Sequence, residues 1–264
     1  MNKIVFTEKI GKDIAIIIAL SLLLSGILNF FFAINFRQGQ IISKQIQPQR
    51  FGYYAVKADD GRRVAGLLLA GMPGDTIYIY QAIPYCNSRN ISGYFSNLFM
   101  IELLKNATSS PDKLPVSFNF MSYTQYYRLK NKILIKPVAL PPYFADTTIY
   151  PYNENIPWNR DNFGRLIIPH KGMHLKLNQY TYELYSPMIE KYEGKKIIFR
   201  NNKFFIKNKQ VKYYTFRHDY YFFLNTNLHI PYDSRSWGPL PRKRIIGKII
   251  NPTPTQTAML MYIK

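Results

Sequence analysis

The feature that constrains this chain most is an uninterrupted apolar segment near its N-terminus. Residues 14–34, IAIIIALSLLLSGILNFFFAI, carry no charge and only three polar side chains, at Ser21, Ser25 and Asn29. A helix rises ~1.5 Å per residue, so one of this length can cross a hydrocarbon core of ~30 Å. A cleaved signal peptide has a shorter apolar region that ends in small residues. We therefore predict a single uncleaved transmembrane anchor at 14–34.

The charges that flank this anchor do not decide its orientation. Three lysines precede it, and two arginines and one lysine follow it within residues 37–50. The positive-inside rule therefore gives three charges against three. Large domains cross a membrane largely regardless of their charge. We expect residues 1–13 to form a cytoplasmic tail and the rest of the chain to lie on the opposite side of the membrane.

Beyond the anchor the sequence favours strands. Tyr and Phe number 22 and 18 and occur in short runs, which is typical of strands. The turn pairs Asn201-Asn202 and Asn208-Lys209 predict a strand meander over 196–216. The predicted helices are 98–105 and 178–192, the second kinked at Pro187, and residues 106–160, rich in Pro and Tyr, predict an irregular insertion. The predicted strands are 53–56, 76–80, 132–135, 166–168, 197–200, 204–207, 211–216, 220–224 and 245–250.

The composition excludes several kinds of site. The single cysteine, Cys86, rules out a disulfide framework and a cysteine-based zinc site, and we expect it to be inert. His170 and His174 are the only close pair among four histidines, so we predict no metal site and no cofactor. Asp59-Asp60-Gly61 is a typical turn sequence, so we interpret it as a turn and not as a pair of catalytic acids.

The chain has a net charge of +20. Part of this charge lies in a basic segment at residues 191–212, which has eight Lys or Arg and one acidic residue, Glu193. It has three interpretations: a solvated basic meander, a contact with anionic lipid headgroups, or a nucleic-acid contact. The predicted membrane anchor and export of the domain argue against nucleic acid.

Three stretches, in order behind the predicted anchor, share motifs with one family. Residues 72–77 read MPGDTI, residues 158–172 read WNRDNFGRLIIPHKG, and residues 233–248 read DSRSWGPLPRKRIIGK. Together they resemble bacterial signal peptidase I, in the branch of that family with a long insertion. The resemblance covers roughly 40–85 and 155–250, and its last motif is long and specific. The matching signature residues are Pro73, Gly74, Asp75, Asp233, Ser234, Arg235, Trp237 and Gly238.

This resemblance implies a mainly β, antiparallel sheet fold behind one N-terminal transmembrane helix. It places the protein in the bacterial inner (cytoplasmic) membrane, with its bulk on the periplasmic side. It also implies a catalytic-like β core made of 36–80 and 215–264, and an inserted β or irregular domain at 81–214. The chemistry that it implies is a serine nucleophile activated by a neutral lysine, whose pKa burial lowers.

The nucleophile position of the family motif is Gln45 in this chain, within Ser43-Lys44-Gln45-Ile46-Gln47-Pro48. Ser43 matches an upstream serine that in the family helps to form the oxyanion hole. An amide side chain cannot form the acyl-enzyme that a serine hydroxyl forms. The expected nucleophile is therefore absent.

The base position is Leu67 in an ungapped alignment, or Arg62 if residues 67–71 are an insertion. Leucine has no titratable group, and a guanidinium stays protonated in proteins, with a pKa above ~12. Either alignment therefore removes the base. Asn225-Thr226-Asn227-Leu228 also departs from the Gly-Asp-Asn-Arg of the family, and Pro231 stands where the family often has a serine.

We therefore expect a non-catalytic homologue of signal peptidase I in the cell envelope. Its expected partners are membrane lipids, exported preproteins or signal peptides, and an active paralogue or a secretion complex. Two alternatives remain open. The first is an active signal peptidase with a displaced dyad, such as Ser43 with Lys44 or Lys57. The second is a lipid-tethered structural scaffold with no peptide site.

Overall fold

The computed structural model describes residues 41–42, 47–95, 99–103, 117–121, 125, 128 and 135–250. For strand residues 41–42, 99–103, 117–121 and 135–138 the description covers the backbone alone. The predicted anchor and cytoplasmic tail lie outside these residues. Within the described ranges, no helix combines the length and the apolar character needed to cross a membrane.

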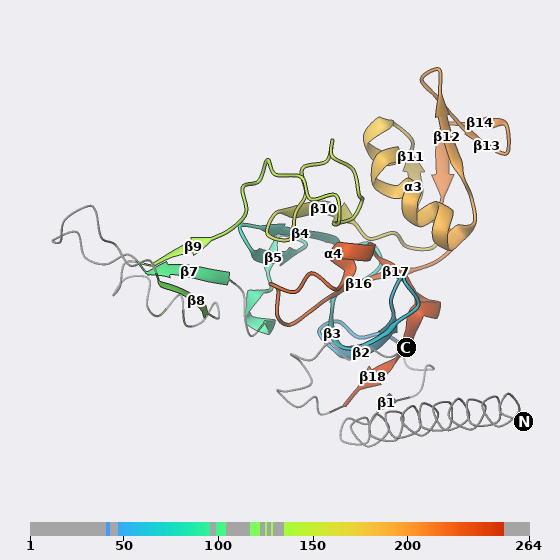
Figure 1. The fold of residues 1–264 in the computed structure, drawn as a ribbon. Coiled ribbons are helices and arrows are strands. Elements are labelled where there is room, and N and C mark those ends of the chain that lie inside the picture. The colour runs from blue at the N-terminus through green and yellow to red at the C-terminus, as the bar shows by residue number, and fades with distance from the viewer. Residues whose placement is uncertain are drawn as a thin grey trace, which may run out of the picture. The chain divides into compact units, whose positions relative to one another are not determined.

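The described chain is mainly β, as the sequence predicts, and the pairings among strands β2–β18 are antiparallel. The largest sheet has six strands and takes them from both ends of residues 41–249 (Figure 1). In spatial order they are β1 (Ile41–Ile42), β18 (Ile245–Ile249), β2 (Tyr53–Lys57), β3 (Arg63–Gly71), β16 (Tyr220–Leu224) and β17 (Leu240–Pro241).

A second sheet of four strands follows directly from the first, because β3 turns into β4. Residues 73–74 make that turn. The order of this sheet is β10 (Phe163–Ile167), β4 (Thr76–Tyr80), β5 (Ile83–Cys86) and β6 (Arg89–Asn90).

Three smaller sheets complete the strands. They are β11 (His174–Lys176) with β15 (Tyr213–Thr215); β12 (Ile197–Arg200), β13 (Lys203–Ile206) and β14 (Lys209–Val211); and β8 (Ser117–Met121), β7 (Phe99–Leu103) and β9 (Ile135–Val138). The described helices are α3 (Gln179–Glu193), α4 (Ser234–Trp237) and the short 3-10 turns η1 (Ser92–Tyr94) and η2 (Arg242–Arg244).

The predicted helix at 178–192 is confirmed as α3, and both of its ends have a local cause. Asn178 accepts a hydrogen bond from the backbone of Thr181, whose hydroxyl in turn accepts one from the Asn178 backbone. This reciprocal capping box satisfies two amides that a helix start leaves unpaired. The helix continues through Pro187 and ends at Gly194, which adopts a left-handed conformation with φ 62°.

The meander predicted at 196–216 is confirmed for β12, β13 and β14, which pair in succession, whereas β15 leaves this sheet and pairs with β11. Asn201 and Asn202 both have positive φ and join β12 to β13, as a two-residue hairpin requires. The second turn lies one residue earlier than predicted, at Lys207 and Asn208.

Three features differ from the sequence-based predictions. The predicted helix at 98–105 is wrong, because residues 99–103 form strand β7, paired with β8 and β9. The predicted irregular insertion at 106–160 contains β8 and β9. Strand β3 was not among the predicted strands, although it pairs with β2 and β16 in the six-stranded sheet.

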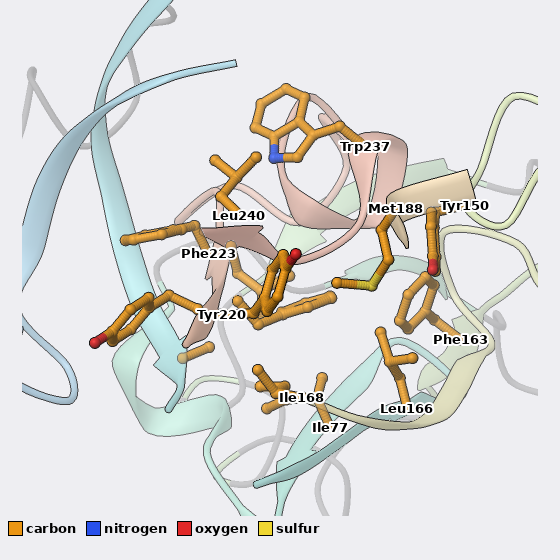
Figure 2. Packing of buried hydrophobic residues seen from close by; sticks show 14 of the residues in the cluster. Ile77, Tyr150, Phe163, Leu166, Ile168, Met188, Tyr220, Phe223, Trp237 and Leu240 are labelled. Atoms are coloured by element: carbon orange, nitrogen blue, oxygen red, sulfur yellow. The ribbon is translucent and has the colours of Figure 1, made fainter. Parts of the chain in front are cut away.

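The core joins the two large sheets to α3 and α4. Every residue of β16 is buried, and β3 is buried from Gly66 onward. Figure 2 shows Phe223, Leu240 and Trp237 from the first sheet and α4 lying above Ile77, Leu166 and Ile168 from the second-sheet region. Met188 of α3 reaches the same cluster. The signature motifs therefore lie on elements with a common hydrophobic core.

Candidate functional site

The Pro73-Gly74-Asp75 motif forms the turn from β3 to β4, and its carboxylate is a hub of hydrogen bonds. Asp75 is 6% exposed. It accepts hydrogen bonds from the Met72 amide at 2.6 Å and from the Asn87 side chain at 2.7 Å. The Gly74 and Ile168 amides, each 2.7 Å from a carbonyl of the facing segment, tie this turn to the chain that follows β10.

Arg50 completes the hub with two hydrogen bonds to Asp75, one of them 3.0 Å long. Burial raises the pKa of the Asp75 carboxyl, but the hydrogen bonds from Arg50, Met72 and Asn87 outweigh it, so the net pKa lies below the usual 3.8. Asp75 is therefore a charged structural anchor for Arg50. Arg50 follows the nucleophile position by five residues, and sequence reasoning had not assigned it a role.

Cys86 lies in the same cluster, 3.0 Å from the Arg50 guanidinium. Burial is the largest of the influences that raise the pKa of its thiol to about 11, and the nearby Asp75 charge adds to it. A thiol with so high a pKa holds little thiolate at neutral pH. This geometry agrees with the inert role expected for Cys86.

The Asp233-Ser234-Arg235 motif begins the short helix α4 and is fully buried. Asp233 and Arg235 form an ion pair of 2.7 Å in which neither side chain is exposed. Asp233 also accepts hydrogen bonds from the Arg235 amide at 2.8 Å and the Asn225 amide at 2.9 Å. The Ser234 hydroxyl accepts one from the Phe223 amide of β16, so this serine is held as a structural acceptor.

The Arg235 guanidinium also donates hydrogen bonds to backbone carbonyls. It donates to Leu228 at 2.6 Å, to Ile230 at 3.1 Å and to Arg160 at 3.2 Å. A buried charge is tolerated when its ion pair and hydrogen bonds compensate for lost solvation. The pair therefore fastens the 225–230 loop, the segment before β10 and α4 together.

Trp237 and Gly238 close α4. The Trp237 indole packs edge-on against Tyr232, with ring centroids 4.9 Å apart. Gly238 has φ 76°, and a Cβ there would lie 2.8 Å from the Tyr150 ring. Both residues therefore serve packing.

The base position expected from the ungapped alignment, Leu67, lies in the hydrophobic core. Leu67 lies in β3 opposite Tyr54 of β2 and is 1% exposed. Its neighbour Leu68, opposite Leu224 of β16, is fully buried. No proton acceptor occupies this position.

The alternative base position, Arg62, lies directly before β3 in an ion pair with Asp60. Its guanidinium stacks over the Tyr232 ring at 4.6 Å, and the Tyr232 hydroxyl donates to Asp60 at 2.7 Å. Burial raises the pKa of Asp60, but the hydrogen bonds from Arg62 and Tyr232 outweigh it and bring the pKa down to about 2. Arg62 is therefore a cation held by an anion, not a base.

The nucleophile position Gln45 and the upstream Ser43 lie outside the described residues. So does Lys44, one candidate for a displaced dyad. The other, Lys57, is exposed in β2. In the part of the chain that the structure describes, the lysine amines make side-chain bonds to Gln49 and Asp59 and none to a hydroxyl.

The turn at Asp59-Asp60-Gly61 is confirmed, and it connects β2 and β3 to distant elements. Asp59 forms an ion pair of 2.5 Å with Lys191 and accepts a hydrogen bond from the Tyr192 hydroxyl. Asp60 binds Arg62 and Tyr232, as above. One turn thus holds the end of α3 and the loop before α4. Sequence reasoning missed this, because its only local signal was a pair of acids in a turn.

Glu193 is a second missed residue. It is 8% exposed and accepts hydrogen bonds from the hydroxyls of Tyr214 and Tyr220, at 2.5 and 3.1 Å. The Arg217 amide donates to it as well. The only acid of the basic segment is therefore turned inward and does not neutralise the lysines around it.

A cleft of about 520 Å³ opens over β4, β5 and β10. Its wall includes Tyr78 and Tyr85, stacked with centroids 4.7 Å apart, and Arg165 lies over the Tyr78 ring at 4.6 Å. Leu67 and Arg62 do not line it. Neither candidate for the expected base therefore faces this cleft.

The two histidines of the predicted close pair are exposed. His174 contacts the Thr215 hydroxyl at 3.0 Å, and His170 contacts the carbonyl of Lys171. Within the described ranges no group of three His, Cys, Asp or Glu is arranged to hold a metal ion.

Comparison with known proteins gives one finding. The model of the family described as signal peptidase, peptidase S26, matches residues 167–253. This stretch includes the Asp233–Gly238 signature but not positions 45, 62 or 67. A search of the curated proteins and a search of the solved structures found no match. Over residues 167–253 the chain is therefore similar to the signal peptidases of family S26, which confirms the resemblance drawn from its motifs.

Proposed function

We propose that this protein is a signal peptidase-like membrane protein that does not cleave peptide bonds and instead binds exported preproteins in the cell envelope. The match to the signal peptidase family supports the first part of this statement. The observation that carries the second part is Leu67, a 1% exposed core residue at the position where the family has its lysine base. A buried hydrocarbon cannot take a proton from a nucleophile.

The retained frame supports binding. The Asp75 hub and the Asp233–Arg235 pair keep the turns around β3 in place although the base position is apolar. Such a frame leaves the sheets able to accept an extended peptide by strand addition. The predicted anchor at 14–34 would keep this surface beside the membrane through which preproteins pass, with the bulk of the chain on the periplasmic side.

The test is a gain of function. The full chain is expressed with a preprotein that carries a small-x-small cleavage site, and cleavage is followed by the size of the product. We expect none from the native chain and cleavage from Gln45→Ser/Leu67→Lys, because a lysine in this apolar position has a lowered pKa and is neutral. Gln45→Ser alone is the matched control, since it supplies a nucleophile without a base.

Two results would contradict the proposal. Cleavage by the native chain that Ser43→Ala abolishes would identify an active peptidase with a displaced dyad. Failure of the native full chain to retain a signal-sequence peptide, in a pull-down against a scrambled peptide, would remove the binding function and leave a scaffold.

A further inference from the structure

The sheet β12–β14 has two faces of different character. Its inner face packs against α3: the Tyr182 ring lies 5.6 Å from Phe204 and 5.9 Å from Phe199. Figure 1 shows this sheet beside α3. Because side chains alternate across a strand, Ile198 and Phe205, which are directly opposite each other, lie on the other face.

This outer face has an apolar centre. Ile198 is 41% exposed, although an isoleucine gains free energy by leaving water. Phe205 is half-buried, and the Arg200 guanidinium lies 4.4 Å from the centre of its ring. We call this surface, formed by Ile198, Arg200, Lys203 and Phe205, the outer face of the meander.

Basic side chains surround this apolar centre, and no acidic side chain of the segment neutralises them. Arg200 and Lys203 are directly opposite each other, and like charges so placed destabilise a sheet. Residues 194–217 contain eight Lys or Arg and no acid, and Glu193 is buried against tyrosines. In the described part of the chain, none of these cations forms an ion pair. The exposed lysines around the outer face are Lys196, Lys207 and Lys212.

We propose that the outer face of the meander binds the surface of a bilayer that contains anionic phospholipid. Cations around an exposed apolar centre suit an interface where charged headgroups meet acyl chains. Nucleic acid fits less well: single strands bind basic grooves through open aromatic faces on which bases stack, whereas the ring of Phe205 is covered by Arg200. This inference goes beyond the proposed function, because it does not depend on whether the protein binds or cleaves a preprotein.

The test places a reporter in the apolar centre of the full chain. Ile198→Trp is reconstituted into nanodiscs of phosphatidylcholine alone or with phosphatidylglycerol, in each case with and without bromine on the acyl chains. Trp158 and Trp237 are buried and give a constant background. We expect brominated lipid to quench the introduced tryptophan in the acidic nanodiscs and not in the neutral ones, and high salt to reverse the quenching.

Charge reversal separates the surface from a general effect of net charge. Lys203→Glu/Lys207→Glu should lower the equilibrium constant for binding of the outer face to the bilayer by about a hundredfold. The reason is that each basic residue near an anionic bilayer strengthens binding severalfold. Lys171→Glu/Lys243→Glu changes two exposed lysines elsewhere by the same charge and should retain the quenching.

Three outcomes would overturn the proposal. The first is no quenching in acidic nanodiscs, and the second is equal quenching in acidic and neutral ones. The third is binding of a duplex oligonucleotide by the chain in neutral nanodiscs that Lys203→Glu/Lys207→Glu abolishes, while the introduced tryptophan stays unquenched in acidic ones. That result would assign the surface to nucleic acid.

Discussion

At the scale of single residues, the two acids of the signature motifs are both buried and both engaged with an arginine. Asp75, directly before β4, accepts hydrogen bonds from Arg50, and Asp233 forms an ion pair with Arg235 inside the core. Each carboxylate also accepts backbone amides. Breaking a fully buried pair by removing one partner costs about 3–5 kcal/mol. The Asp233–Arg235 pair, with neither side chain exposed, is therefore expected to contribute strongly to stability whether or not the protein has an active site.

Asp75 gives a prediction about pH. Its folded pKa lies below 3.8, so the stabilisation from its charged form is present above the unfolded pKa and is lost as pH falls through the folded value. We expect Asp75→Asn to lower the free energy of unfolding at pH 7 and to flatten its decline below about pH 4. Urea unfolding of the full chain in detergent, at several pH values, measures both effects.

Asp60→Asn is the control for this experiment. The pKa of Asp60 is also lowered, to about 2, but its side chain is 40% exposed. Exposed ion pairs contribute little to stability, so this variant should change the free energy of unfolding at pH 7 much less. Equal losses from the two variants would contradict the hub at Asp75.

At the scale of elements, the junction of β10 with β4 depends on a residue without a side chain. Gly164 has φ 90°, and a Cβ there would lie 2.6 Å from the Ile77 carbonyl oxygen. Backbone atoms cannot move aside as a flexible side chain can. The register of β10 against β4 shifts at this point, between Phe163 and Leu166.

We expect Gly164→Ala to destabilise the protein by about 2–4 kcal/mol, through both the left-handed backbone and the clash. Gly172→Ala is a matched control, because Gly172 has φ 84° but no atom within 4 Å of its added Cβ. It should cost only about 1–2 kcal/mol. Thermal unfolding of both variants gives the comparison, and equal costs would show that the close approach to Ile77 is unimportant.

At the scale of the whole molecule, contacts between remote parts of the sequence fasten α3 to the large sheet. Asp59, at the turn between β2 and β3, binds Lys191 and Tyr192 at the end of α3. Arg244, after β17, lies over the Tyr192 ring at 5.6 Å and donates to the Ala58 carbonyl. The turn between β2 and β3 therefore connects the end of α3 to the N-terminal strands of the sheet and to the segment that follows β17.

Asp59→Asn should loosen this connection without unfolding the sheet. The Asp59 side chain is 16% exposed, and its bonds are of the charged kind, with a net contribution of about 1.5–3 kcal/mol. We expect faster amide hydrogen exchange in the last turn of α3 and unchanged exchange in β2 and β3. Faster exchange throughout the chain would instead indicate global destabilisation and contradict a local role for Asp59.

Local patterns predicted elements well where local forces decide them. The Asn178 cap and Gly194 end of α3, and the Asn201-Asn202 hairpin, depend on residues adjacent in sequence. Residues 98–105 show the opposite. Their Leu, Met, Glu and Lys favour a helix, but residues 99–103 pair with β8 and β9. Strand β3 was missed because it is buried on both faces and so lacks alternation.

The sequence by itself determined the β class and the resemblance to signal peptidases, because these follow from residue identity and motif spacing. Only the tertiary structure decided which charges have partners. It joined Arg50 to Asp75 and Asp59 to Lys191, and it turned Glu193 inward so that the outer face of the meander stays positive. These outcomes depend on distances between residues far apart in the chain, and Coulomb and hydrogen-bond energies depend on those distances and on burial.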